Sequence, residues 1–152
     1  MITIEPYYQG AEKELFEIFT TAITEICSKD YSPEQIRAWI SGEYNHEQWG
    51  KKLENIQPYI ATLGNKVVGY ADIQSDGYID HFFVHGSYQS KGIGSALMKT
   101  LLSSNPQVGR AYAHVSITAR PFFEKKGFRL VKENIVTKQA VSLHNYTMER
   151  KS

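Results

Sequence analysis

A change of hydrophobic period near residue 58 constrains the fold more than any other feature of the sequence. Residues 10–28 carry apolar side chains three and four positions apart, which is typical of an amphipathic helix with one buried stripe. Residues 58–84 instead hold three segments rich in β-forming residues, joined by short turns at 64–66 and 75–77. Three strands connected in this way predict an antiparallel meander, so we expect helices combined with a largely antiparallel sheet.

Shorter signals complete the expected fold. A short strand is predicted at residues 2–5, ending at Pro6. A second helix is expected to begin with Ser32 as its N-cap and Pro33 in its first turn, and to end at Gly42. The later segments predict a loop or broken helix at 43–55, a helix at 92–103, a strand at 110–115, a short helix at 118–126, and a closing hairpin of strands 128–137 and 141–148.

Composition narrows the class of protein. The chain has 152 residues, of which 41% are hydrophobic, enough for the core of one domain. A formal net charge of +1 argues against a general nucleic-acid binder, and the single Cys27 excludes an intrachain disulfide. There is no run of about 20 apolar residues and no secretory signal, so we expect a cytoplasmic protein without membrane partners. His81 and His85 have no third ligand at motif spacing, so we expect no metal.

A glycine-rich segment between the meander and the following helix is the clearest candidate binding site. Gly92 and Gly94 stand where that helix begins, and glycine lets the backbone approach a ligand closely. The unpaired N–H groups and the dipole of a first helical turn bind anions such as a pyrophosphate, with Lys91 at the rim. The alternative is a glycine-rich helix start that binds nothing. The P-loop and dinucleotide motifs fit poorly, because Lys91 precedes the glycines and Leu97 replaces a small residue.

Two motifs resemble those of the GCN5-related N-acetyltransferases. The run Gln89-Ser-Lys-Gly-Ile-Gly94 is similar to that family's acetyl-CoA pyrophosphate loop, Gln/Arg-x-x-Gly-x-Gly/Ala. Residues 116–128 resemble its Asn-x-x-Ala-x-x-Phe-Tyr-x-x-x-Gly-Phe segment, and the order of elements from about residue 57 onward is also similar. The resemblance implies an α/β (α+β) fold, with a mixed, mostly antiparallel central sheet of about six to seven strands. Four helices would flank this sheet, which would be splayed at the fourth strand.

The same resemblance implies how the chain is divided and where acetyl-CoA binds. Residues 1–152 would form a single acetyltransferase-like domain, with 1–56 on the acceptor side and 57–152 as the acetyl-CoA-binding core. The pantetheine arm would pair with the backbone of the fourth strand as an added strand, and the loop amides would hold the pyrophosphate. Lys125 and Lys126 would be within reach of the 3′-phosphate; the alternative is that they are solvated surface lysines. The implied cofactor-binding residues are Phe82, Phe83, Val84, Gln89, Ser90, Lys91, Gly92, Ile93, Gly94, Ser95, Ser116, Phe123 and Lys126.

Two positions depart from the family pattern. Ser116 replaces the family's Asn, and Phe123 replaces the Tyr proposed to protonate the departing thiolate. A phenyl ring has no proton to give, so that role is missing at Phe123. Tyr112 and Tyr146 are substitute acids that the sequence does not place.

Acetyl transfer to an amine further requires an oxyanion donor and a base. The backbone N–H of Val84 is the expected donor, and Asp80 and His81 are the candidate bases. Successive strand residues point to opposite faces, so at most one of the two should face the acceptor unless a bulge intervenes. Asp80 shares its face with Phe82 and Val84, whereas His81 has the more suitable ordinary pKa. For each residue the alternative is a polar strand position without a catalytic role.

The resemblance therefore predicts an N-acetyltransferase. We expect transfer from acetyl-CoA, as co-substrate, to a primary amine of a small molecule by direct attack in a ternary complex. The alternatives are a non-catalytic CoA-binding or sensing module, which Ser116 and Phe123 would suit, and a protein or peptide N-acetyltransferase. A homodimer is possible. The aromatic residues Tyr31, Trp39, Tyr44 and Trp49 are expected near the acceptor, where core packing explains them as well as ligand binding.

Overall fold

Two four-stranded sheets and five α-helices make up the fold in a computed structural model, which describes residues 1–40, 45–104 and 109–151. In the first sheet the order is β1-β2-β3-β5, and in the second it is β4-β6-β8-β7. The strands are β1 (Ile2–Pro6), β2 (Tyr59–Leu63), β3 (Lys66–Ala71), β4 (Tyr78–Ile79), β5 (Phe82–Val84), β6 (Arg110–Ser116), β7 (Arg129–Lys138) and β8 (Val141–Lys151).

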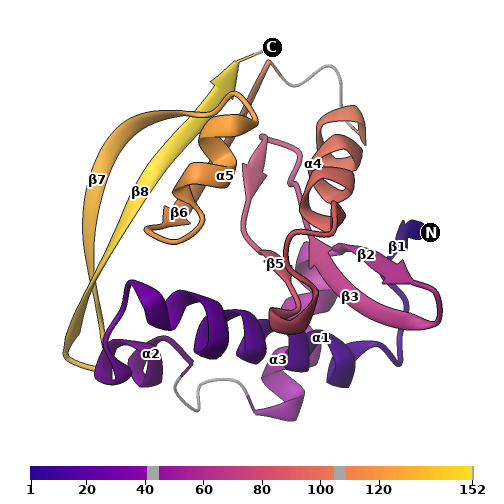
Figure 1. Ribbon diagram of the computed structural model, residues 1–152, viewed down its shortest axis with the longest axis horizontal. Coiled ribbons are helices and arrows are strands. Elements are labelled where there is room, and N and C mark those ends of the chain that lie inside the picture. The colour runs from indigo at the N-terminus through magenta and orange to yellow at the C-terminus, as the bar shows by residue number, and fades with distance from the viewer. Residues whose placement is uncertain (41–44, 105–108, 152) are drawn as a thin grey trace.

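The helices lie in two groups. Figure 1 shows α1, α2 and α3 along the bottom of the view, and α4 and α5 at the top. Their bounds are α1 (Glu12–Thr21), α2 (Pro33–Ile40), α3 (His46–Ile56), α4 (Ile93–Ser104) and α5 (Arg120–Lys125). A π-helical turn at Ala22–Ile26 and a 3-10 turn at Cys27–Lys29 extend α1, and another 3-10 turn, Gly86–Tyr88, precedes α4. Together these elements confirm the mixed α/β fold with a splayed sheet that the sequence predicts.

The helix starting after Ser32 forms as expected. The Ser32 side chain accepts from the Gln35 amide at 3.1 Å, and the Gln35 side chain accepts from the Ser32 amide at 2.8 Å. This reciprocal pair is a capping box, which satisfies two otherwise unpaired donors. The predicted end of the helix at Gly42 lies outside the described residues.

The expectation of a loop or broken helix at 43–55 is wrong, because α3 occupies most of this segment. Asn45 caps α3 by accepting from the amide of Gln48 at 2.8 Å. Trp49, Leu53 and Ile56 are buried on one face at helical spacing. These three apolar residues are enough to form the buried face of α3. The polar residues between them make the helical pattern hard to detect in the sequence.

The predicted third strand of the meander is two strands, which is the main correction to the expected topology. β2, β3 and β5 pair antiparallel as expected, but β4 pairs parallel with β6 in the other sheet. The chain changes sheets at Asp80 and His81. There the amide of His81 donates to the side chain of Asp72 at 2.5 Å, so this amide is not available to continue a ladder.

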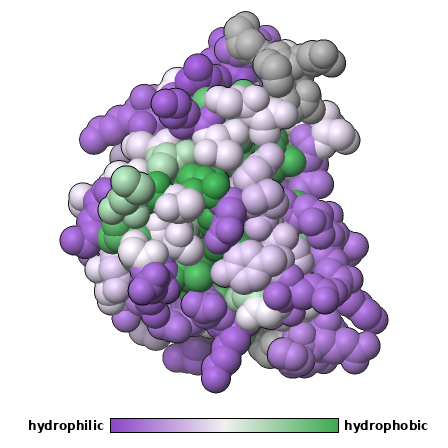
Figure 2. All heavy atoms as spheres, turned by 90° about the vertical axis from the view of Figure 1, so that its right-hand side faces the viewer, coloured by the Kyte–Doolittle hydropathy of each residue, from purple (hydrophilic) through white to green (hydrophobic). Residues whose placement is uncertain are grey.

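Each helix group covers its own core. Buried side chains of α1, α2 and α3 form one cluster with Ile60, Val67 and Tyr70. Buried side chains of α4, α5, β6 and β8 form the other, which includes Val68 and Ala71. Because strand residues alternate in direction, β3 contributes to both clusters. Seen from the right-hand side of Figure 1, the surface is hydrophilic around its margin, with hydrophobic residues gathered toward its centre (Figure 2).

None of the described helices is both long and apolar enough to cross a membrane.

Tyr31 ties the start of α2 to one end of the second sheet, where β6 ends beside β8. Its hydroxyl donates to the carbonyl of His144 at 2.6 Å and accepts from the amide of Ile117 at 2.9 Å. We predict that Tyr31→Phe lowers the free energy of unfolding by about 1–2 kcal/mol, since two backbone groups lose their partner. Urea denaturation measures this. The control is Tyr112→Phe, whose exposed hydroxyl bonds Asp76 and whose loss should change stability by less than about 0.5 kcal/mol. Equal losses in the two variants would contradict the account.

Candidate active site

The split between the two sheets exposes the backbone of β5. His85 donates its amide to Val68 at 2.8 Å, and the carbonyl of His81 accepts from Asp72 at 3.1 Å, both on the side of β3. Hydrogen bonding in an antiparallel pair alternates along the strand, so Phe82 and Val84 direct their backbone groups away from β3 and into the split. The carbonyl of Val84 accepts from the side chain of Gln89 at 2.8 Å. The N–H of Val84, the oxyanion donor expected from the sequence, thus points into the split.

A cavity of about 370 Å³ lies in this split. It is lined by every residue predicted to bind the cofactor except Lys91 and Lys126. Lys91 is exposed on the loop, and the Lys126 ammonium lies 5.6 Å from the ring centre of Phe122, which does line the cavity. The lining residues outside the predicted cofactor-binding set are Ala22, Ile26, Cys27, Tyr88, Thr118, Ala119 and Phe122.

The loop before α4 presents a row of backbone donors to the cavity. Gly92 has φ +83° and its carbonyl accepts from the Ala96 amide at 3.0 Å, so helical bonding begins there. The amides of Ile93, Gly94 and Ser95 therefore lie in the first turn, where an α-helix supplies no partner. A Cβ at Gly94 would lie 3.1 Å from the ring of Phe122. These donors, with the helix dipole behind them, fit the pyrophosphate of a CoA ester.

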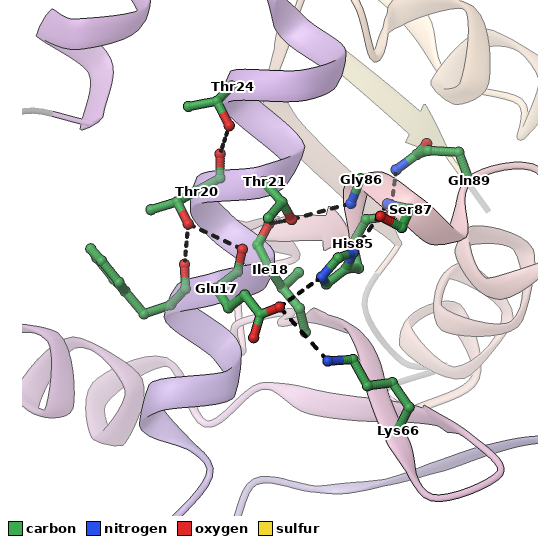
Figure 3. A network of polar contacts seen from close by, with 11 residues as sticks. Glu17, Ile18, Thr20, Thr21, Thr24, Lys66, His85, Gly86, Ser87 and Gln89 are labelled. Carbon is green, nitrogen blue, oxygen red and sulfur yellow. Dashed lines mark hydrogen bonds and ion pairs between the residues drawn. The ribbon is translucent and has the colours of Figure 1, made fainter.

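A polar network holds α1 against this loop (Figure 3). The His85 ring bonds Glu17 through Nε2 at 3.0 Å and accepts from the Ser87 amide through Nδ1 at 3.0 Å. Because Nδ1 accepts, Nε2 carries the hydrogen, and this bond lowers the pKa of Glu17. Thr21 accepts from the amide of Gly86 at 3.2 Å. Both ring nitrogens of His85 are therefore engaged in hydrogen bonds that fix the loop before α4 and hold it against α1.

A second cavity of about 220 Å³ holds both candidate bases, Asp80 and His81. Phe83 and Ser116 line this cavity and the first one, so the two cavities meet at these residues. The break at 80–81 brings Asp80 and His81 to the same cavity, which a regular strand would not do. The other lining residues are Phe19, Tyr31, Trp39, His114, Val136, Lys138, Leu143, His144 and Asn145. Trp49 instead packs in the core, and Tyr44 lies outside the described residues.

Asp72 creates the break, and the sequence analysis did not single it out. Its buried carboxylate accepts from the amides of His81 at 2.5 Å and Asp80 at 3.4 Å, and from the Gln74 side chain at 2.6 Å. Burial raises the pKa of Asp72 to about 6. The signal available in the sequence was an acidic residue directly after an apolar strand segment, between Ala71 and Ile73.

His81 and Asp80 differ in their electrostatic surroundings. The buried His81 ring stacks on Phe19 with centroids 5.9 Å apart, and its Nδ1 lies 2.9 Å from the hydroxyl of Tyr70. Burial lowers the pKa of His81 to about 4, so the ring is neutral at pH 7. Asp80 instead forms an ion pair with Lys52 at 2.5 Å. The His81 ring is therefore unprotonated at pH 7, whereas the carboxylate of Asp80 is engaged by the ammonium of Lys52.

Neither of the two tyrosines that the sequence offers as substitute acids takes the place of Phe123; the described tyrosines that line the cavities are Tyr88 in the first and Tyr31 in the second. The Phe123 ring is buried against Phe82 and Phe128, at centroid distances of 5.6 and 5.0 Å. Tyr112 donates to the exposed Asp76, and Tyr146 stacks under Arg120. Neither tyrosine lines either cavity.

Among the residues that the structure describes, no group of three or more His, Cys, Asp or Glu side chains is arranged to share a metal ion.

Comparison with known proteins agrees with this geometry. A family profile described as an acetyltransferase (GNAT) domain matches residues 27–150. An uncharacterised N-acetyltransferase of Escherichia coli K12, YafP, is 35% identical over 150 residues, covering 99% of this chain and 96% of that protein. The crystal structure of a GCN5-related N-acetyltransferase from Rhodopseudomonas palustris matches 99% of this chain and 95% of its own, at 28% identity and TM-score 0.93. The PaiA N-acetyltransferase of Thermoplasma acidophilum, solved with coenzyme A, shares the fold at TM-score 0.75 and 18% identity, over 100% of this chain and 99% of its own.

Asp72 and His81 should affect the pH dependence of stability in opposite directions. Between pH 3.8 and about 6, folded Asp72 holds a proton that the unfolded chain releases, so its contribution falls as pH rises. Between about pH 4 and 6.5, unfolded His81 holds a proton that the folded chain lacks, so its contribution rises with pH.

We predict that the unfolding free energy of Asp72→Asn rises more steeply than that of wild type between about pH 4 and about 6, whereas that of His81→Gln falls relative to wild type. Urea unfolding at several pH values measures both slopes. Parallel profiles for the three proteins would contradict the assignment.

Proposed function

The chain belongs to the GCN5-related N-acetyltransferase family and is an acetyl-CoA-dependent N-acetyltransferase. On that premise, we propose that it acetylates the primary amine of a small molecule by direct attack in a ternary complex. The observation that carries the proposal is the meeting of two cavities at Phe83 and Ser116, one with the loop donors and one with His81. This arrangement lets two ligands lie end to end, with the acyl group at the junction.

The loop and β5 are the proposed binding surface for acetyl-CoA. The first-turn amides of α4 would hold the pyrophosphate, and the open backbone of Phe82 and Val84 would pair with the pantetheine amides. When bound, acetyl-CoA supplies the activated acetyl group. The roles of the individual residues in the list of implied cofactor contacts belong to this proposal.

Two groups of the chain would act at the junction. The Val84 N–H donates a hydrogen bond to the thioester oxygen as negative charge develops on it. His81 takes the proton that the amine nitrogen loses on forming its bond to the carbonyl carbon, while the C–S bond breaks. The neutral ring is available for this step because burial lowers the pKa of His81 to about 4. Asp80, paired with Lys52, would hold the ammonium of the acceptor, which gives one proton to water before the neutral amine attacks.

The departing thiolate has no phenol beside it at Phe123. Because an ordinary thiol has a pKa of about 8.5, a thiolate can leave and take its proton from water. The same absence favours the second candidate, a CoA-binding module without turnover, which would bind the ester and release no thiol. A protein or peptide acceptor fits less well, since the acceptor cavity is only about 220 Å³.

Location in the cytoplasm and a homodimer remain predictions. The edge strand β7 exposes Leu130, Val131, Ile135 and Val136, and an apolar edge of this kind suits a second copy.

Gly92→Trp tests whether the loop before α4 binds the pyrophosphate of acetyl-CoA. We predict that calorimetric binding of acetyl-CoA and of CoA is weakened at least about 100-fold, since a bulky side chain at the start of α4 crowds the first-turn amides. Gly64→Trp is the matched control, because Gly64 also has positive φ and open space but lies in the β2–β3 turn. Loss of binding in both variants would show that backbone strain, not the loop, is responsible.

His81→Gln tests the base. We predict a loss in kcat of about 10² or more with acetyl-CoA binding retained, and less than about tenfold for Asp80→Asn. In wild type, kcat/KM should rise with pH toward the pKa of the acceptor amine, without an inflection near 6.5, because the pKa of His81 is about 4. Thiol release measures both. A wild-type kcat in His81→Gln would show that His81 is not the base.

A further inference from the structure

We propose that the hydroxyl of Tyr70 is a positioning group for His81: it accepts a hydrogen bond from Nδ1 of the ring, so that Nε2 carries no hydrogen and can take the proton of the amine. This inference rests on the proposed function and adds to it the residue that orients the base. It comes from the geometry of the two side chains and from the hydrogen-bonding roles of a histidine ring.

Tyr70 and His81 meet between the first sheet and the second cavity. Tyr70 lies on β3 and is fully buried, and its hydroxyl lies 2.9 Å from Nδ1 of His81, a hydrogen-bond distance. His81 lines the second cavity, whereas Tyr70 lines neither cavity. Any effect of the Tyr70 hydroxyl on the acceptor is therefore exerted through the His81 ring.

The neighbouring aromatic rings hold the plane of the His81 ring. Phe19 stacks on it with centroids 5.9 Å apart, and the rings of Phe83 and Trp49 lie at 5.6 and 6.1 Å. These apolar contacts do not distinguish which ring nitrogen carries the hydrogen. The Tyr70 hydroxyl does, because it engages Nδ1 and leaves Nε2 as the nitrogen available to a ligand.

A histidine that acts as a base must present a nitrogen without a hydrogen. If the Tyr70 hydroxyl donated to Nδ1, Nε2 would carry the single hydrogen of the neutral ring and could not accept another. If the hydroxyl oxygen accepts from Nδ1–H, Nε2 is free to accept. Once Nε2 has taken the proton, both ring nitrogens are donors, and the same accepting oxygen still satisfies Nδ1. One arrangement thus serves His81 before and after the proton transfer.

The buried ring needs such an acceptor because its charged form is disfavoured. Burial lowers the pKa of His81 to about 4; the charge of Asp80 opposes this shift, and the charges of Lys52 and Lys138 add to it. A hydrogen bond made by the charged form stabilises that form. The oxygen of Tyr70 can provide this bond without placing another charge in the core.

Nitrogen chemical shifts of the histidine rings test the tautomer directly, at about pH 8, above the ordinary titration range of histidine. We expect the hydrogen of His81 on Nδ1 and that of His85 on Nε2, because Nδ1 of His85 accepts from the Ser87 amide. His85 is thus a matched control of opposite tautomer in the same spectrum. The spectrum of His81→Gln identifies the His81 signals among the five histidines. A hydrogen on Nε2 of His81 would overturn the inference.

Tyr70→Phe removes the hydroxyl and keeps the ring. Thiol release from acetyl-CoA is measured with phenethylamine, leucine and spermidine, and the fastest acceptor is used for all variants. We predict that kcat falls about tenfold or more while both KM values stay within about twofold, because the bond to Nδ1 strengthens only as the ring becomes charged. Tyr59→Phe is the matched control, since Tyr59 lies on the neighbouring strand β2, is partly buried and lines neither cavity. It should keep kcat within about twofold of wild type.

A double variant separates positioning from a structural role. In a His81→Gln background, Tyr70→Phe should change kcat by less than about twofold, because the base that it positions is already absent. A loss of kcat by the same factor in both backgrounds would show a structural effect and overturn the positioning role.

Failure of this inference is distinguishable from failure of the proposed function. A wild-type kcat in Tyr70→Phe would overturn the inference and leave acetyl transfer standing. Binding of acetyl-CoA without thiol release for any of the three amines would overturn the small-molecule proposal, and the role of Tyr70 in catalysis with it, whichever tautomer His81 adopts.

Discussion

The hydrogen bonds from the amides of Asp80 and His81 to the buried carboxylate of Asp72 are the interaction on which the site depends. A buried carboxylate needs donors, and here the donors are taken from the backbone of a strand. The strand therefore stops, the chain passes from one sheet to the other, and β5 is left with one open edge. A structure in which 78–84 formed one continuous strand would have neither the split nor the open backbone.

The break also explains why the two ligands are proposed to meet where they do. It places the backbone of Val84 at one cavity and the side chains of Asp80 and His81 at the other, with Phe83 and Ser116 between them. The hydrogen bonds among Glu17, Thr21, His85 and Gly86 hold the loop before α4 against α1. The proposed cofactor site and the proposed acceptor site thus share the same supporting elements, as direct transfer between two bound ligands would require.

Much of this could be predicted from local sequence. Helical spacing located α1 and α4, and turn residues located the β2–β3 hairpin. The residues implied by the family resemblance include eleven of the eighteen that line the first cavity. The strand break and the second cavity could not be predicted in this way, because they depend on contacts between residues that are distant in the sequence. Asp72 acts on residues eight and nine positions later, and the acceptor cavity joins residues of α1, β5, β7 and β8, so no local pattern marks Lys138 as its neighbour. The helix α3 was missed because three apolar residues in a polar segment give a weak signal.

Amide hydrogen exchange measured by NMR, with and without CoA, tests the central claim most directly. The account predicts new protection at the amides of Val84 and of Ile93, Gly94 and Ser95, which have no strand or helix partner and face the first cavity. Binding of CoA with no change at Val84 and the first turn of α4, and with protection elsewhere, would contradict the proposal that the split between the sheets is the cofactor site.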